Sequence, residues 1–255
     1  MELFSSFLEI AQLTSVQLGF ILFVVLAGAY VQASVGFGLS LLAVPFLAFV
    51  IPDRLPQVLL ICGLPTFIVI LLQERHHIEV KEFSVILAAR ILGVVPGVAV
   101  VAMLSLNALR VLFAAVIIAA SIALLVRSTS IPLTGPSMVI AGLLSGVMAT
   151  AASIGGPPIA LLYSGRRGPE IRAGMSAVFL VGNILSVVGL ALNDPLSRAD
   201  LAISGALLLP VGVGIVVSMR TRQLVSRGRI RVVVIALSML ASVGLLVEVA
   251  RSSLL

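Results

Sequence analysis

Eight long apolar blocks, separated by short polar segments, run along the chain. They cover residues 16–51, 55–73, 83–104, 108–126, 137–164, 171–193, 199–219 and 230–250. About 20 apolar residues cross a bilayer once as a helix, which pairs its own backbone polar groups in the absence of water. The blocks lack the alternation over about 10 residues that marks a membrane β-barrel. The pattern predicts an all-α polytopic membrane protein with about 8 to 10 membrane helices.

The first and fifth blocks are longer than one crossing, and polar and helix-breaking residues interrupt both of them. Residues 32–45 read QASVGFGLSLLAVP, and residues 149–165 read ATAASIGGPPIALLYSG. A helix break in lipid leaves backbone groups unpaired, and a bound ion or substrate can supply the missing partners. The two breaks therefore predict a substrate site, although small residues in membrane helices also serve close packing. We expect alanine at Gly36 or Gly155 to leave the fold intact and to block a bound anion.

The two halves of the chain resemble each other, with the same order of features. A shift of 119 residues superposes the two breaks, and a shift of 121 gives five identities in seven positions near the end of each half. The matches place 34–36 on 153–155, Gly63 on Gly182, and 120–126 on 241–247. We infer two repeats, 1–130 and 131–255, within one membrane domain. Parallel and inverted arrangements both remain open, and we favour inversion because it brings both breaks to one midplane site.

The amino-acid composition restricts the classes of function that this protein can have. The chain is 60% hydrophobic and only 10% charged, with a mean hydropathy of +1.27, whereas soluble domains are about 25% charged. The net charge of +6 comes from basic residues in short loops, where membrane topology explains them better than nucleic acid does. No P-loop, catalytic triad or mid-block carboxylate pair is present in the sequence. We therefore expect no enzyme, cofactor or nucleic-acid partner, and the single cysteine, Cys62, excludes an internal disulfide.

Two polar residues lie deep inside predicted helices. Arg90 is eight residues into its block, which corresponds to about 12 Å of helical rise. At that depth it either faces a cavity, where it would attract an anion, or extends along the helix to the interface. Asn183 lies in the middle of its block and either bonds a substrate oxygen or holds a neighbouring helix.

Charged residues near the block ends carry less information. Asp53–Arg54 and Glu170–Arg172 follow the two long blocks at equivalent places, as gate-side ion pairs or as interfacial anchors; we expect anchors. His76 and His77 are adjacent in a charged loop, without the spacing or the cysteines of a zinc site. We expect no metal there.

The two interrupted stretches resemble the repeated signature of the TauE/SafE family, also called the toluenesulfonate uptake permease group. The resemblance covers nearly the whole chain, including its length and its two halves. It implies a membrane carrier for small anions, often sulfur-containing, such as sulfite, sulfoacetate or other sulfonates. The matching positions are Gly36, Gly38, Pro45, Gly155, Gly156 and Pro157. Phe37 stands where the second half has Gly156, so the halves differ at this point.

The distribution of basic residues predicts the orientation of the chain. The loops around 166–172 and 220–231 carry most of the arginines and should face the cytoplasm. Inverted repeats would place eleven Lys and Arg residues inside and four outside, whereas parallel repeats would give ten and five. The protein is then a multi-pass protein of the cytoplasmic (inner) membrane.

These observations converge on a secondary transporter or facilitator of small, sulfur-containing anions. Its partners would be the anion and the lipid bilayer, and the sequence allows a homo-oligomer without specifying one. The alternative is a membrane scaffold or assembly factor in which the small residues only pack helices. The predicted substrate-binding residues are Gln32, Ser34, Gly36, Gly38, Arg90, Ser153, Gly155, Gly156, Pro157 and Asn183.

Overall fold

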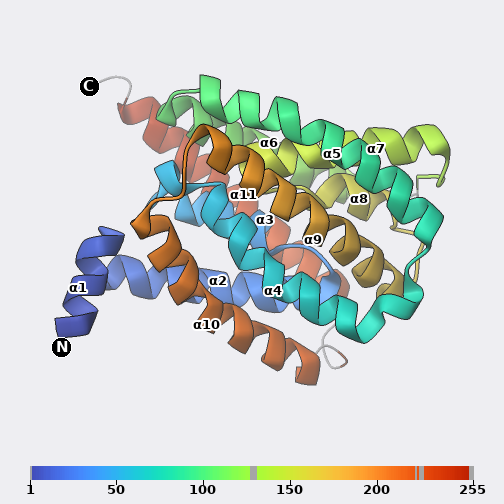
Figure 1. Ribbon diagram of the computed structural model, residues 1–255, viewed down its shortest axis with the longest axis horizontal. Helices are drawn as coiled ribbons and strands as arrows, with labels where there is room; N and C mark the ends of the chain where they lie inside the picture. The colour runs from blue at the N-terminus through green and yellow to red at the C-terminus, as the bar shows by residue number, and fades with distance from the viewer. Residues whose placement is uncertain (1, 127–130, 222, 224–226, 253–255) are drawn as a thin grey trace.

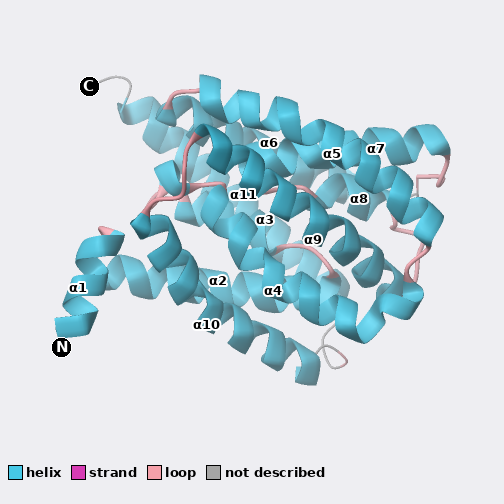
Figure 2. Cartoon of the chain, in the orientation of Figure 1, coloured by secondary structure: helices cyan, strands magenta, loops and turns pink. Residues whose placement is uncertain are grey.

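The computed structural model describes residues 2–126, 131–221, 223 and 227–252, and within these ranges every regular element is a helix (Figure 2). The long helices are α2 (Ser15–Val35), α4 (Gln57–Glu74), α5 (Val80–Met103), α6 (Leu106–Val126), α7 (Gly135–Ala152), α9 (Gly168–Asn193), α10 (Arg198–Thr221) and α11 (Arg227–Ser252). The short ones are α1 (Glu2–Ala11), α3 (Leu39–Leu47), α8 (Gly156–Leu162) and the 3₁₀ turns η1 (Pro52–Arg54) and η2 (Arg75–His77).

Eight of the described helices are long and apolar enough to cross a membrane, which confirms the predicted all-α polytopic fold. Their outward faces carry large apolar side chains, such as Leu72, Val95 and Leu209, each at least 70% exposed. Exposing such a large apolar surface to water would be unfavourable, whereas lipid tails are as apolar as these side chains. The inner faces of the same helices form one continuous core.

Each of the two long apolar blocks folds as a long helix followed by a short one, as the breaks predicted. Helix α2 ends at Gly36 with a φ of 106°, and Gly38, with a φ of 129°, precedes α3. Helix α7 ends at Ser153 with a φ of 58°, and α8 begins at Gly156. A positive φ at these three positions ends the regular helix, because an α-helix requires a negative φ. Glycine adopts this conformation without strain at Gly36 and Gly38, whereas Ser153 is an L residue in the left-handed region.

The helices that the 119-residue shift superposes run in opposite directions. Helices α4 and α9, which lie side by side in Figure 1, are such a pair. They are antiparallel, because Gly63 lies near Asn183 while Glu74, at the end of α4, binds Arg172, near the start of α9. Helix α5 packs parallel to α7, and α10, its equivalent, packs parallel to α2. This is the geometry of inverted repeats; the duplication itself stays a prediction from the sequence.

Glycine allows the backbones of α5 and α7 to pack in direct contact. A Cβ at Gly146 would lie 2.2 Å from the carbonyl oxygen of Arg90, and one at Gly142 would lie 2.4 Å from that of Ile86. Such small residues let membrane helices approach closely. The seam holds α5 against α7, and Arg90 lies on the buried face of α5.

The loops that contain most of the basic residues gather at one end of the helix bundle, which we call the basic end. Arg166, in the loop before α9, forms an ion pair with Glu82, near the start of α5. Gln73, near the end of α4, hydrogen-bonds Met219, near the end of α10. The loop with Arg75 thus lies with the other basic loops, as in the inverted count of eleven against four; Arg127 and Arg222 fall outside the described residues.

The orientation can be tested with introduced cysteines, because the native Cys62 is fully buried. Cysteines at Arg75, Arg167 and Arg227 are expected to react with a membrane-impermeant thiol reagent only from the cytoplasmic side. A cysteine at Arg198 is expected to react only from the outside. Labelling of the Arg198 and Arg167 positions from the same side would contradict this arrangement.

Candidate functional site

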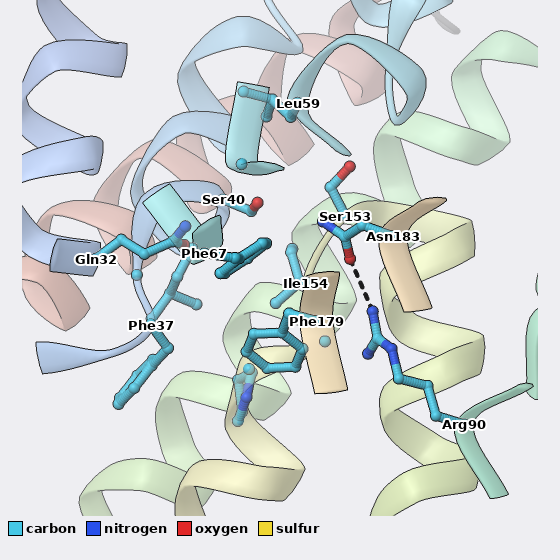
Figure 3. A pocket seen from close by; sticks show the side chains of 16 residues that line it. Gln32, Phe37, Ser40, Leu59, Phe67, Arg90, Ser153, Ile154, Phe179 and Asn183 are labelled. Atoms are coloured by element: carbon cyan, nitrogen blue, oxygen red, sulfur yellow. Dashed lines mark hydrogen bonds between the residues drawn. The ribbon is translucent and has the colours of Figure 1, made fainter. Parts of the chain in front are cut away.

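A small pocket lies between the two helix breaks, in the interior of the bundle (Figure 3). Eight of the ten predicted site residues line it, namely Gln32, Gly38, Arg90, Ser153, Gly155, Gly156, Pro157 and Asn183. Its other walls are Phe37, Ser40, Leu41, Leu59, Gly63, Phe67, Ile154 and Phe179. The cavity volume is about 30 Å³, which is enough for a water molecule or two. Residues from both halves of the chain thus meet at one site.

Arg90 provides the positive charge of the pocket. Its side chain is fully buried, which excludes the interpretation that it extends to the interface. It donates from Nη2 to Oδ1 of Asn183 at 2.8 Å and from Nη1 to the carbonyl oxygen and the hydroxyl of Ser145. The guanidinium also lies 4.9 Å from the ring centre of Phe179, a cation–π contact. All of these partners are neutral, and the ion pairs of the described residues do not include Arg90.

Glycines make the space that the Arg90 side chain occupies. A Cβ at Gly182 would lie 1.9 Å from Nε of Arg90, and one at Gly155 would lie 2.6 Å from its Nη1. Gly182 was not among the predicted site residues, although its match to Gly63 under the 119-residue shift was a signal. Gly63 itself lines the pocket, opposite Asn183.

The first break contributes hydrogen-bond donors that lack partners. Nε2 of Gln32 is buried and unpaired. Helix α3 begins without a side-chain cap, and two residues of its first turn, Ser40 and Leu41, line the pocket. The first backbone N–H groups of a helix have no partner within it and favour an anion.

The second break differs from the first in its donors. Pro157 and Pro158 occupy the first turn of α8, so two of its backbone N–H groups are absent. The break instead contributes glycine surface at Gly155 and Gly156 and the hydroxyl of Ser153, which donates to the carbonyl oxygen of Pro56 at 2.8 Å. The two halves therefore contribute unequally, in line with the difference between Phe37 and Gly156.

Ser34 and Gly36, both predicted to bind substrate, do not line the pocket. The Ser34 hydroxyl donates to the carbonyl oxygen of Tyr30 and shares a hydrogen bond of 2.9 Å with Ser218 on α10. Gly36 faces Arg172, whose Cγ would lie 3.1 Å from an added Cβ. Alanine is strained at Gly36 by its positive φ and crowded at Gly155 by Arg90, which corrects the expectation that both positions tolerate it.

The predicted acid–base neighbours have further partners in the fold, although Asp53 also lies within ion-pair distance of Arg54, at 3.9 Å. Arg54 binds Asp200 at the start of α10 at 3.2 Å, and Glu170 binds Arg167 at 2.9 Å. Arg172 is buried and pairs with Glu74, from which 98 residues separate it. Arg172 is therefore not an interfacial anchor. Glu74 directly follows the second apolar block, so its position beside a charged loop concealed its burial.

The fold and the pocket define a class: polytopic membrane proteins with a central site between two broken helices, the architecture of secondary transporters. The model of the TauE/SafE sulfite exporter family matches residues 20–245, and the chain belongs to this family. Membership implies membrane anion transport, in agreement with the positive pocket. Neither the curated proteins nor the solved structures gave a significant match to the chain.

Proposed function

We propose that the protein is a secondary transporter or facilitator that carries small sulfur-containing anions, such as sulfite, sulfoacetate or other organosulfonates, across the cytoplasmic membrane. The observation that carries this proposal is the buried charge of Arg90, whose described partners are all neutral. The name of the family supports sulfite as one substrate. Organosulfonates are included because a sulfonate group, like sulfite, presents negatively charged oxygens to the Arg90 guanidinium.

A buried charge without a counter-charge is unfavourable, and this argues for an anion at the site. Arginine stays protonated in proteins, so it cannot become neutral to escape the cost of burial. Arg172, which is also buried, has the carboxylate of Glu74 as its counter-charge. An oxyanion beside Arg90 would supply what Glu74 supplies to Arg172. Gln32 and the first turn of α3 would then donate to its remaining oxygens.

The volume of the pocket indicates that the structure is a closed conformation. A space of about 30 Å³ accommodates water but not an oxyanion of sulfur with its three or more heavy atoms. The aromatic walls formed by Phe37, Phe67 and Phe179 must move apart to admit one. Carriers with inverted repeats provide such motion by rocking one part of the bundle against another around a fixed site.

A flux assay in proteoliposomes tests the proposal against the scaffold alternative. We expect uptake of sulfite and of at least one organosulfonate above that of empty liposomes, and slower uptake of acetate or other carboxylates. Sulfate serves as the test of selectivity among sulfur oxyanions. If correctly folded protein moves none of these anions, the scaffold interpretation replaces the transporter.

A further inference from the structure

Unpaired polar atoms extend from the pocket towards the basic end of the protein. Buried side-chain atoms without a partner include Nε2 of Gln32 on α2, Oγ1 of Thr66 on α4, and Oγ of Ser176 and Nη1 of Arg172 on α9. These four side chains are all at most 5% exposed. Buried polar groups normally have partners, so such a group calls for an explanation, of which an unseen ion or water is one.

The helix positions of these residues place them along one junction. Ser176 follows Arg172 by four residues on α9, and Gln32 precedes Gly36 by four on α2, so each pair shares a helix face. Gly36 contacts Arg172, which shows that the two faces meet. Because α2 and α9 are antiparallel, Gln32 and Ser176 both lie one turn deeper than this contact. Gln32 reaches the pocket.

The ion pair of Arg172 and Glu74 closes the junction at the basic end. Nε of Arg172 donates to both carboxylate oxygens of Glu74, at 3.1 and 2.9 Å, and Nη2 also binds the carboxylate. The pair joins α9 to the end of α4. Arg172 has five N–H donors in a planar fork, which suits an oxyanion as well as a carboxylate.

On the opposite side of the pocket, several polar groups are paired. The Ser153 hydroxyl bonds the carbonyl oxygen of Pro56, and Thr150 and Ser186 bond each other at 2.7 Å. Nε2 of Gln57 donates to the carbonyl oxygen of Asp194 at 3.0 Å. Oγ of Ser204 on α10 and Nε of Arg110 on α6 are also unpaired. The group of unpaired donors shared by α2, α4 and α9, however, lies on the side of the pocket towards the basic end.

We propose that the anion passes between the pocket and the basic end along the junction of α2, α4 and α9, and that Arg172 binds it on the way. Glu74 holds this route closed by occupying the guanidinium, and a passing anion replaces its carboxylate there. The proposal deepens the proposed anion transport and rests on it. It assigns Arg172, Ser176 and Gln32 to a second anion-binding position, between Arg90 and the basic end.

Thiol modification tests the route without requiring transport. A Ser176→Cys variant, in vesicles with the basic end outward, is treated with 2-sulfonatoethyl methanethiosulfonate and with its trimethylammonium analogue. Relative to a free thiol in solution, we expect the anionic reagent to react about tenfold faster than the cationic one, because Arg172 lies one helical turn away on the same face of α9. The parent, whose Cys62 is fully buried, gives the baseline. Equal relative rates, or no reaction above this baseline, would overturn the route.

Neutralising Glu74 tests the closing ion pair. We expect Glu74→Gln, combined with Ser176→Cys, to raise the rate of modification by the anionic reagent about tenfold, since Arg172 then lacks its counter-charge. Asp200→Asn is the matched control, because it neutralises the partner of Arg54 at the other end of the bundle. An unchanged rate with Glu74→Gln, or the same acceleration with Asp200→Asn, would mean that the pair only holds helices together.

The two proposals fail in different ways. Flux of the anions without modification of the thiol at position 176 would leave transport intact and refute this route. Charge-selective modification without flux of any anion would support the route and refute transport of those substrates. Protection is measured with sulfoacetate rather than sulfite, because sulfite attacks methanethiosulfonate reagents; slower modification in sulfoacetate supports binding on the route.

Discussion

An Asn183→Asp variant is expected to lose anion transport while it folds as well as the parent. The new carboxylate would take the place of an amide oxygen that accepts from Arg90 at 2.8 Å, with almost the same shape. It would give Arg90 an internal counter-charge, as Glu74 does for Arg172. The hydrogen bond from Nδ2 of Asn183 to the carbonyl oxygen of Leu60, at 3.4 Å, is long and would be a small loss.

The size of the effect follows from the charge that is cancelled. At about 5 Å and an effective dielectric constant of about 20, an anion and one positive charge interact by about 3 kcal/mol. Cancelling that interaction would lower the affinity for the anion about 100-fold. The anion that enters would also be repelled by the carboxylate. We therefore expect flux to fall by about two orders of magnitude.

Two measurements on the same preparation check this expectation. Flux of sulfite is compared with the melting temperature in detergent, with and without the anion, since a bound ligand stabilises the folded state. We expect a melting temperature like that of the parent and no upward shift with the anion. Asn193→Asp, the same change at the exposed end of α9, is the control and should transport normally. Normal flux in Asn183→Asp would show that the charge of Arg90 does not act on the substrate.

Replacing Arg90 itself is the second change with a large expected effect. Arg90→Leu removes the charge, and we expect flux to fall to that of empty liposomes. Arg90→Lys keeps a point charge but loses the planar fork that binds both Asn183 and Ser145. Each hydrogen bond to a charged group is worth about 1.5–3 kcal/mol, so we expect flux at about one tenth of the parent or below.

The order of the variants distinguishes a substrate site from a structural role. A substrate site predicts that flux falls from the parent through Lys to Leu, while all three proteins reach the membrane and elute as folded protein. Arg198→Leu, the same substitution at the exposed start of α10, should leave flux unchanged. If loss of flux instead follows loss of thermal stability in all the variants, Arg90 would be a packing residue.

Much of the fold was predictable because lipid acts on local properties of the sequence. Each block of about 20 apolar residues must form a helix, since no water is present to bond its backbone. The two breaks were predictable for the same reason, because Gly36, Gly38, Ser153 and Gly155 are residues that interrupt a helix locally. The breaks lie where the sequence placed them, and eight of the ten predicted site residues line one pocket.

The sequence could not separate residues of one break that face the pocket from those that do not. Gln32, Ser34 and Gly36 are within five residues of one another, yet only Gln32 lines the pocket. Rotation of α2 by its packing against α10 turns Ser34 to Ser218. That rotation depends on the neighbouring helix and has no local signal.

The sequence by itself determined the membrane class, the helical crossings, the two breaks and the bias of basic residues to one end. Only the tertiary structure decided which polar residues meet. Arg90 bonds Asn183 across 93 residues, and Arg172 bonds Glu74 across 98. Hydropathy and helix breaking are properties of a short segment in lipid, and so a short segment reveals them. A buried charge finds its partner through the direction, rotation and register of two packed helices, which are fixed only when the whole bundle assembles.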